Sequence, residues 1–163
     1  MMISEFPIVF LAIFVEVPTP FLDVFFQRIA SLTYPKSRIH LLVHFNEDAN
    51  FQHGILEHFN STHGLRYKMT TEVFANTEVE ARSTALSACS ANVECEFIFM
   101  IDGVAQLTKK DTLEHLVTTN RNFVAPLLRR RGKLWSNFWG ALNKDGYYAR
   151  SDDYVDLVES ERM

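Results

Sequence analysis

Apolar residues along the chain fall into short continuous runs, separated by segments whose apolar positions recur at helical spacing. Residues 8–15 are apolar throughout, and residues 38–45 and 96–101 are mostly so. Runs of this kind are typical of strands that are buried on both faces of a sheet. Residues 67–74 form a weaker candidate strand. Together these segments predict a largely buried sheet.

Two helices are predicted in the first half of the chain. We expect Thr19 to cap the first helix and Pro20 to occupy its first position, because proline suits that position. Its apolar positions are Phe21, Leu22, Phe25, Phe26 and Ile29. The second helix runs from about residue 50 to residue 59, and we expect Gly64 to end it in the left-handed conformation.

Two further helices are predicted after residue 75. Thr77 and Glu80 match a capping box, which predicts the start of a helix through Val79, Leu86 and Cys89. A helix at 111–120 leads to the apolar run 123–128, and its expected inward positions are Leu113, Leu116 and Val117. The charged segment 152–163 predicts a final helix with nothing packed after it.

Strands alternate with helices along the chain, and the strands are apolar rather than alternating. This order predicts an α/β fold with a mostly parallel central sheet. A length of 163 residues predicts one domain, residues 1–163. Because the chain stops directly after its last predicted helix, we expect the fold to be truncated at the C-terminus.

Composition excludes several classes of protein. Hydrophobic residues make up 47% of the chain and aromatic residues 13%, which argues against disorder. A net charge of −4 argues against a general nucleic-acid binder. No apolar run approaches the ~20 residues of a spanning helix. The run at 6–15 lacks a positively charged lead and a small-residue cleavage site, so it predicts a buried strand rather than a signal peptide.

The two cysteines, Cys89 and Cys95, allow two interpretations. They are either buried thiols or a disulfide around a small loop, and spacing alone favours neither. Asn60 begins an Asn-Ser-Thr triplet, which is an acceptor sequence for N-glycosylation. A disulfide and a glycan would both indicate an oxidising compartment.

Acidic residues that could bind a ligand lie at the expected carboxyl ends of the strands, where ligands bind in open parallel sheets. Glu16 follows the first strand, Glu47 or Asp48 the second, and Asp102 the fourth. No glycine-rich fingerprint follows the first strand, so a dinucleotide fold is disfavoured, and the single Gly103 is too little to cradle phosphates.

The histidines and cysteines predict no catalytic centre. None of the six histidines is followed two residues later by an acidic residue, as a non-haem iron site commonly requires. We expect His40 and His44 to be half-buried at a strand edge rather than to bind metal. No Gly-x-Ser-x-Gly motif occurs, and neither cysteine has an adjacent base that would mark it as a nucleophile.

A basic run and two tryptophans follow residue 128. The run at 129–133 either is simply solvated or binds phosphate. Trp135 and Trp139 lie close to Asn137 and Gly140, and they either pack as core or form a stacking platform for sugar or peptide. Core packing is the commoner role of tryptophan and is the preferred interpretation.

The segment 132–158, "GKLWSNFWGALNKDGYYARSDDYVDLV", resembles the procollagen lysyl hydroxylases, which are multidomain collagen-modifying enzymes of the endoplasmic reticulum. The resemblance extends back through "NFVAPLL", "CEFIFMID" and "FVEVPTPFLDVFFQRI". It implies a Rossmann-like, glycosyltransferase-A type three-layer fold and a central accessory domain. It also implies a parent enzyme that uses Fe²⁺, 2-oxoglutarate and ascorbate in a separate hydroxylase domain.

The resemblance also bears on Asp102. Active glycosyltransferases of this fold carry Asp-x-Asp here, whose carboxylates hold a Mn²⁺ that bridges the diphosphate of a nucleotide sugar. The family's accessory domain usually reads Asp-Ala-Asp, whereas this chain reads Asp102-Gly103-Val104. Valine offers no oxygen to a hard cation. We therefore expect no cofactor in this segment, and expect Asp102 to bond backbone amides of its own loop.

The leading functional prediction is a non-catalytic glycosyltransferase-like domain, located in the endoplasmic reticulum and bridged by Cys89 and Cys95 as the resemblance implies. Its expected partners are the flanking domains, procollagen and a second copy of the parent chain. The expected contact surface comprises Arg129, Arg130, Arg131, Trp135, Asn137 and Trp139. One alternative is an active Mn²⁺-dependent collagen galactosyl- or glucosyltransferase in which Glu16 or Asp48 completes the metal site. Another is a fragment that does not fold alone.

Overall fold

The computed structural model describes residues 6–130 and 132–159. The chain divides into two compact units, one up to Asn120 and one from Arg121 onward. The single domain expected over residues 1–163 stays a prediction, and each unit is described by itself. No helix in the described ranges is long and apolar enough to cross a membrane.

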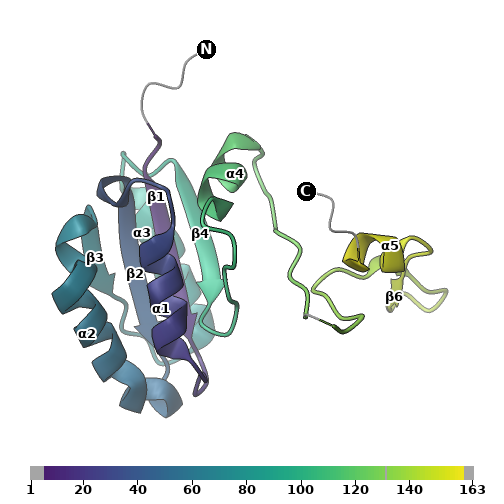
Figure 1. Cartoon of the computed structure of the whole chain (residues 1–163), viewed down its shortest axis with the longest axis horizontal. Helices are drawn as coiled ribbons and strands as arrows, with labels where there is room; N and C mark the ends of the chain where they lie inside the picture. Colours follow the sequence, from purple (N-terminus) through teal and green to yellow (C-terminus); the bar gives the residue numbers. More distant parts are fainter. Residues whose placement is uncertain (1–5, 131, 160–163) are drawn as a thin grey trace. The chain divides into compact units, whose positions relative to one another are not determined.

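The first unit is built on a four-stranded sheet. Its strands are β1 (Val9–Val15), β2 (Ile39–Phe45), β3 (Met69–Glu72) and β4 (Phe97–Asp102). They lie in the order β3-β2-β1-β4, and every neighbouring pair is parallel (Figure 1). The predicted α/β fold with a mostly parallel sheet is therefore confirmed.

Strand β1 lies inside the sheet, and all seven of its residues are buried. Because successive side chains point to opposite faces, alternate residues join two separate cores. Phe14 is paired with His44 on one side and with Asp102 on the other. The parallel register therefore brings the ends of three strands to one edge of the sheet.

Helices cover both faces of this sheet, which gives the predicted three layers (Figure 1). Helices α1 (Leu22–Ser31), α2 (His53–His63) and α4 (Thr112–Thr118) pack on one face. Helix α3 (Glu78–Ala91) covers the other face through two small residues, Ala81 and Ala85. Short 3₁₀ turns occupy Lys36–Arg38, Glu47–Gln52 and Gly64–Arg66.

The helix ends differ from prediction at two places and agree at one. Thr19 does not cap α1, because its backbone N–H and C=O each form a 2.8 Å hydrogen bond with the side chain of Gln52. Phe21 occupies the N-cap position instead, with φ 58°. Gly64 has φ −54° and begins a 3₁₀ turn, so the left-handed prediction is also wrong. Thr77 Oγ1 does accept a hydrogen bond from the Glu80 amide, at 3.2 Å.

The two histidines of β2 are buried rather than half-buried at an edge. Their strand is paired with β1 and β3 on its two sides, so it is not at an edge of the sheet, and both side chains are buried. The ring of His40 stacks on that of Phe10, with centroids 4.5 Å apart. Burial, and then the charge of Lys68, lower the pKa of His40 below its ordinary value. His40 is therefore an uncharged residue of the core.

The second unit holds an antiparallel hairpin that the sequence analysis did not predict. Strands β5 (Gly140–Leu142) and β6 (Tyr148–Arg150) precede helix α5 (Tyr154–Glu159), which lies in the predicted final helix. Residues 160–163 of that prediction lie outside the described residues. The run 123–128 forms no regular element. Trp135 and Trp139 are 56% and 44% exposed, so their interpretation as core is wrong.

Candidate functional site

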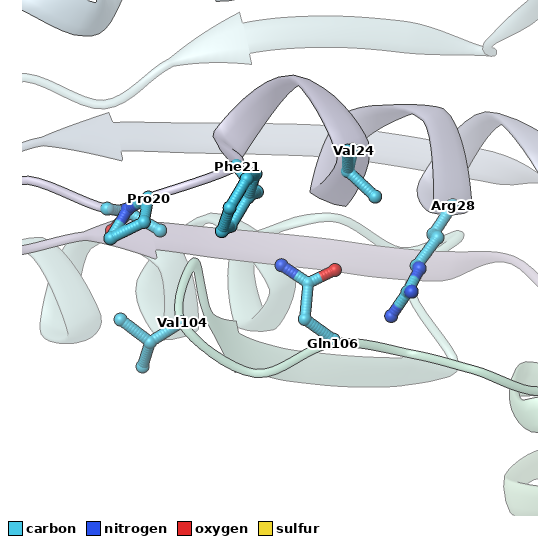
Figure 2. A pocket seen from close by; sticks show the side chains of 7 residues that line it. Pro20, Phe21, Val24, Arg28, Val104 and Gln106 are labelled. Carbon is cyan, nitrogen blue, oxygen red and sulfur yellow. The ribbon is translucent and has the colours of Figure 1, made fainter.

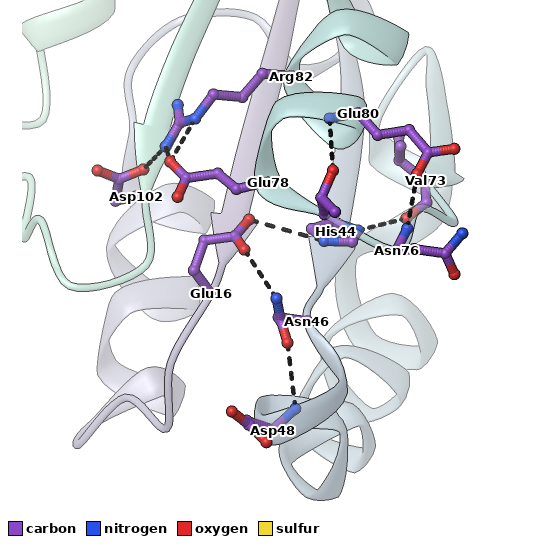
Figure 3. Close-up of polar contacts among 11 residues, drawn as sticks. Glu16, His44, Asn46, Asp48, Val73, Asn76, Glu78, Glu80, Arg82 and Asp102 are labelled. Atoms are coloured by element: carbon purple, nitrogen blue, oxygen red, sulfur yellow. Dashed lines mark hydrogen bonds and ion pairs between the residues drawn. The ribbon is translucent and has the colours of Figure 1, made fainter.

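The carboxyl ends of β1, β2 and β4 meet helix α3 at one edge of the sheet (Figure 3). Asp102 is the last residue of β4, as the sequence predicted, and half of its side chain is exposed. Its Oδ1 lies 2.5 Å from Nη2 of Arg82 on α3. The carboxylate is thus paired with a cation that belongs to the chain.

Arg82 is held in place from three sides. Its Nε donates a 2.8 Å hydrogen bond to Oε1 of Glu78, one helical turn earlier. Its guanidinium lies over the ring of Phe14, 4.4 Å from the centroid, which is a cation–π arrangement. Burial opposes the charged form, but the hydrogen bonds from Asp102 and Glu78 outweigh it and raise the pKa of Arg82. Arg82 therefore stays charged beside Asp102.

The loop after Asp102 does not use its carboxylate. The Ala105 amide donates to the main-chain carbonyl of Asp102, at 2.9 Å, whereas the side chain bonds Arg82. The expectation that Asp102 bonds amides of its own loop is therefore wrong. A Cβ added to Gly103 would lie 3.3 Å from Val15 Cγ2, which explains the small residue there. Val104 is exposed and presents only methyl groups.

A second polar group lies at the ends of β1 and β2 (Figure 3). Nδ1 of His44 donates to the carbonyl of Val73, at 2.9 Å, which leaves Nε2 facing Oε1 of Glu16 at 3.7 Å. His44 is fully buried, and Glu16 is mostly so. Because the carbonyl accepts the Nδ1 proton, the histidine is oriented by the residue that follows β3 and is turned toward the carboxylate of Glu16, which follows β1.

Asn46 links this group to the next loop. Its Nδ2 donates to Glu16 Oε2 at 3.3 Å, and its Oδ1 accepts from the Asp48 amide at 3.4 Å. Glu16 and Asp48 therefore contact Asn46 and are not brought to Asp102. Within the described ranges, no three His, Cys, Asp or Glu side chains lie close enough to hold a metal ion. The residues at Asp102 do not fit the donor set that a divalent cation requires.

The expected contact surface of the second unit is only partly available. Arg129 donates to the Val158 carbonyl at 2.9 Å, and Asn137 forms hydrogen bonds with Leu128 and Pro126, so both side chains fix the fold. Arg130 and Trp135 line a hollow of about 430 Å³ together with Lys133 and Leu134. Trp139 is exposed. Arg131 lies outside the described residues.

The remaining predicted residues lie away from the strand ends. The sulfurs of Cys89 and Cys95 are 1.99 Å apart and form a disulfide. Asn60 lies inside α2, where its Oδ1 is buried and accepts no hydrogen bond from any described residue. The hydroxyls of Ser61 and Thr62 both donate to the His58 carbonyl. Glycosylation of Asn60 stays a prediction.

Comparison with known proteins identifies the family. Residues 6–163 match the family described as glycosyltransferase family 25, N-terminal domain. The chain belongs to this family. It is 47% identical to the rat multifunctional procollagen lysine hydroxylase and glycosyltransferase LH3, over 96% of this chain and 21% of that protein. It is 42% identical to bovine procollagen-lysine,2-oxoglutarate 5-dioxygenase 1, over 96% of this chain and 22% of that protein. The resemblance to the lysyl hydroxylases is thereby confirmed, and this family 25 chain spans about a fifth of the length of those relatives.

Solved structures confirm the glycosyltransferase-A fold of the family 25 chain. A mannosyltransferase from Pyrobaculum calidifontis, in complex with GDP-Man and Mn²⁺, superposes with a TM-score of 0.56 at 17% identity. The superposition covers 70% of this chain and 32% of that one. TarS of S. aureus gives a TM-score of 0.53 at 14% identity, over 68% of this chain and 19% of that one. At these identities the similarity concerns the fold.

The contact that sequence reasoning missed is the one between Arg82 and Asp102. The two residues are 20 positions apart, and no motif joins them. The sequence does contain one half of this arrangement, because Glu78 and Arg82 are spaced as an i, i+4 ion pair on the helix that precedes β4. That pair places a cation on α3, but only the packing of α3 against β1 and β4 directs it to Asp102.

Proposed function

We propose that this chain is an accessory, non-catalytic glycosyltransferase-like domain of a procollagen lysyl hydroxylase. The parent enzyme would hydroxylate collagen lysines with Fe²⁺, 2-oxoglutarate and ascorbate in another domain of a longer chain in the endoplasmic reticulum. The relatives that support this proposal are about five times as long as the matched segment, and their names are those of a procollagen lysine hydroxylase and a procollagen-lysine dioxygenase. The role of this domain is to space and orient its neighbours.

The contact between Arg82 and Asp102 carries the non-catalytic part of this proposal. A metal-dependent glycosyl transfer needs a divalent cation to neutralise the diphosphate leaving group. Here the Asp102 carboxylate is already paired with a guanidinium, and Val104 supplies no ligand oxygen. A cation entering this site would have to displace Arg82, and it would then meet only the carboxylates of Asp102 and Glu78, which are fewer oxygen ligands than a hard divalent cation takes.

A titration with Mn²⁺ followed by electron paramagnetic resonance tests this proposal. We expect no micromolar binding by the 163-residue chain, and no transfer from uridine diphosphate galactose or glucose to hydroxylysine peptides. The matched variant Val104→Asp with Arg82→Gln restores a second carboxylate and removes the competing cation, so it should bind Mn²⁺ more tightly than the wild type. Micromolar binding by the wild type that Asp102→Ala abolishes would disprove the inert role.

An active transferase is the second candidate function. It is favoured by the glycosyltransferase in the name of the LH3 relatives and by the Mn²⁺ and GDP-Man complex of a structural neighbour. It requires Glu16 or Asp48 to move to Asp102 from their present contacts with Asn46. Turnover that depends on Mn²⁺ and is lost in Glu16→Gln would support this candidate over the accessory role.

Contact with procollagen belongs to the same proposal. The exposed rings of Trp135 and Trp139, with Arg130, form a surface of the second unit that is free to meet a partner. Binding to an immobilised triple-helical collagen peptide should weaken in Trp135→Ala and in Trp139→Ala. Phe123→Ala removes an aromatic residue that is more exposed than either tryptophan and serves as the control. Equal loss in all three variants would contradict a specific surface.

A further inference from the structure

An apolar hollow lies between the loop that enters α1 and the loop that follows β4 (Figure 2). It is an open depression with a volume of about 430 Å³, which is within the range of small-ligand sites. Its walls are mainly the side chains of Pro20, Phe21, Val24 and Val104. None of the residues that contact Arg82 lines it, so this hollow is separate from the contact between Arg82 and Asp102.

Arg28 is the charged residue in the lining of this hollow. Its guanidinium lies at the end of the hollow away from Pro20 (Figure 2). Among the residues that the structure describes, no carboxylate pairs with it. The amide of Gln106 lies between Val104 and Arg28 as a further polar group. One cation beside an apolar wall is complementary to an anion that carries an apolar group.

Phe21 adds an independent observation. Its φ of 58° places a bulky residue in the left-handed region, which costs about 1–2 kcal/mol. Its side chain is 75% exposed, so no burial of the ring in the described structure offsets this cost. Strained residues of this kind cluster at ligand sites. The ring forms one wall of the hollow (Figure 2).

We propose that this hollow binds a singly charged carboxylate carried on an aromatic or branched aliphatic group. The carboxylate pairs with the planar guanidinium of Arg28, which suits two parallel hydrogen bonds. The apolar group packs against Phe21 and Val24. A single guanidinium balances one negative charge, so a carboxylate matches the hollow better than a doubly charged phosphate. This site goes beyond the proposed accessory role and does not depend on it.

Calorimetric titration of the full 163-residue chain with 3-phenylpropionate tests this proposal. The matched probe 3-phenylpropanamide has the same apolar group and no charge. We expect saturable binding of the acid. The amide should bind at least about tenfold more weakly than the acid. Arg28→Gln should reduce acid binding about tenfold and leave amide binding unchanged. Arg66→Gln removes an exposed cation elsewhere and should change neither.

Two further measurements separate a lost site from a lost fold. Thermal unfolding by circular dichroism should give the same midpoint for Arg28→Gln and Arg66→Gln. Val24→Asp places a negative charge against the apolar wall and should weaken the acid more than the amide. Equal binding of acid and amide, or no saturable binding at millimolar concentrations, would overturn the proposal. Displacement of the acid by uridine diphosphate would also overturn it, because it would assign the hollow to a nucleotide.

Discussion

Nη2 of Arg82 and Oδ1 of Asp102 lie 2.5 Å apart and join helix α3 to the end of β4. The same guanidinium bonds Glu78 and lies over Phe14 of β1, so one side chain connects three elements of the first unit. A residue with this many contacts fixes the geometry of the strand end.

A double-mutant cycle should detect coupling between these two residues. Arg82→Met keeps the aliphatic contact with Phe14, and Asp102→Asn keeps the size of the acidic side chain. Because half of the Asp102 side chain is exposed, we expect a coupling energy of only about 0.5 kcal/mol in urea unfolding. The coupling should shrink in ~1 M salt, which screens exposed charges. A coupling energy of zero at low salt would contradict the ion pair.

His53 should make stability depend on pH. Its Nε2 lies 2.8 Å from Glu72 Oε1, and this hydrogen bond raises the pKa of His53 despite some burial, with a smaller contribution from Glu57. A raised folded-state pKa stabilises the fold fully below the unfolded pKa of about 6.5 and loses that stabilisation as pH rises through the folded value.

Urea unfolding of wild type and His53→Gln at several pH values between 5 and 9 measures this effect (the range brackets the ordinary histidine pKa of about 6.5). The difference in the free energy of unfolding should favour the wild type at acidic pH and shrink as pH rises. His58→Gln removes a histidine from an exposed position of the same helix and is the matched control. A difference that grows toward alkaline pH would refute the assignment.

Two phenylalanines should differ sharply in their contribution to stability. Phe25 lies on the buried side of α1 and is fully buried, whereas Phe74 is 82% exposed. Phe25→Ala should lower the free energy of unfolding by about 3–5 kcal/mol, because it leaves a cavity in the core. Phe74→Ala should change it by less than about 0.5 kcal/mol. A cooperative melt of the wild type in the same experiment would also exclude a fragment that does not fold alone.

The disulfide between Cys89 and Cys95 should stabilise the chain modestly. It closes a short loop with a sequence separation of 6, and chain-entropy arguments give about 2 kcal/mol for such a loop. The double variant Cys89→Ala with Cys95→Ala should lose that amount. Thiol titration of the unfolded wild type should find free cysteines only after reduction. Two reactive thiols before reduction would contradict the bond.

The sheet and its helices could be predicted because their periodicity is local. The apolar run at 8–15 predicts β1 without knowledge of its neighbours, and the spacing of Phe25, Phe26 and Ile29 predicts α1. The prediction for Thr19 failed because its partner, Gln52, is 33 residues away, and such a contact has no local signature. The hairpin at 140–150 was missed because its strands are only three residues long.

The sequence could predict where the candidate site lies but not which of its side chains contact one another. Parallel strands bring Asp102 and Glu16 to one edge, and that edge follows from the fold class alone. Which side chains face each other depends on register and helix packing. His44 turns to Glu16 because Val73 accepts its other ring proton, and Arg82 reaches Asp102 because small residues let α3 approach the sheet. Trp135 and Trp139 were misplaced because core and surface tryptophans look alike in sequence.

The guanidinium that neutralises Asp102 is covalently part of the polypeptide. A strand tip balanced by a dissociable ion would change its conformation with the supply of that ion, whereas this one carries a permanent counter-charge. If the domain has the accessory role that we propose, the geometry where β4 ends should not change with chelators or with manganese availability. A domain with that property would keep its shape while the metal content of its surroundings fluctuates.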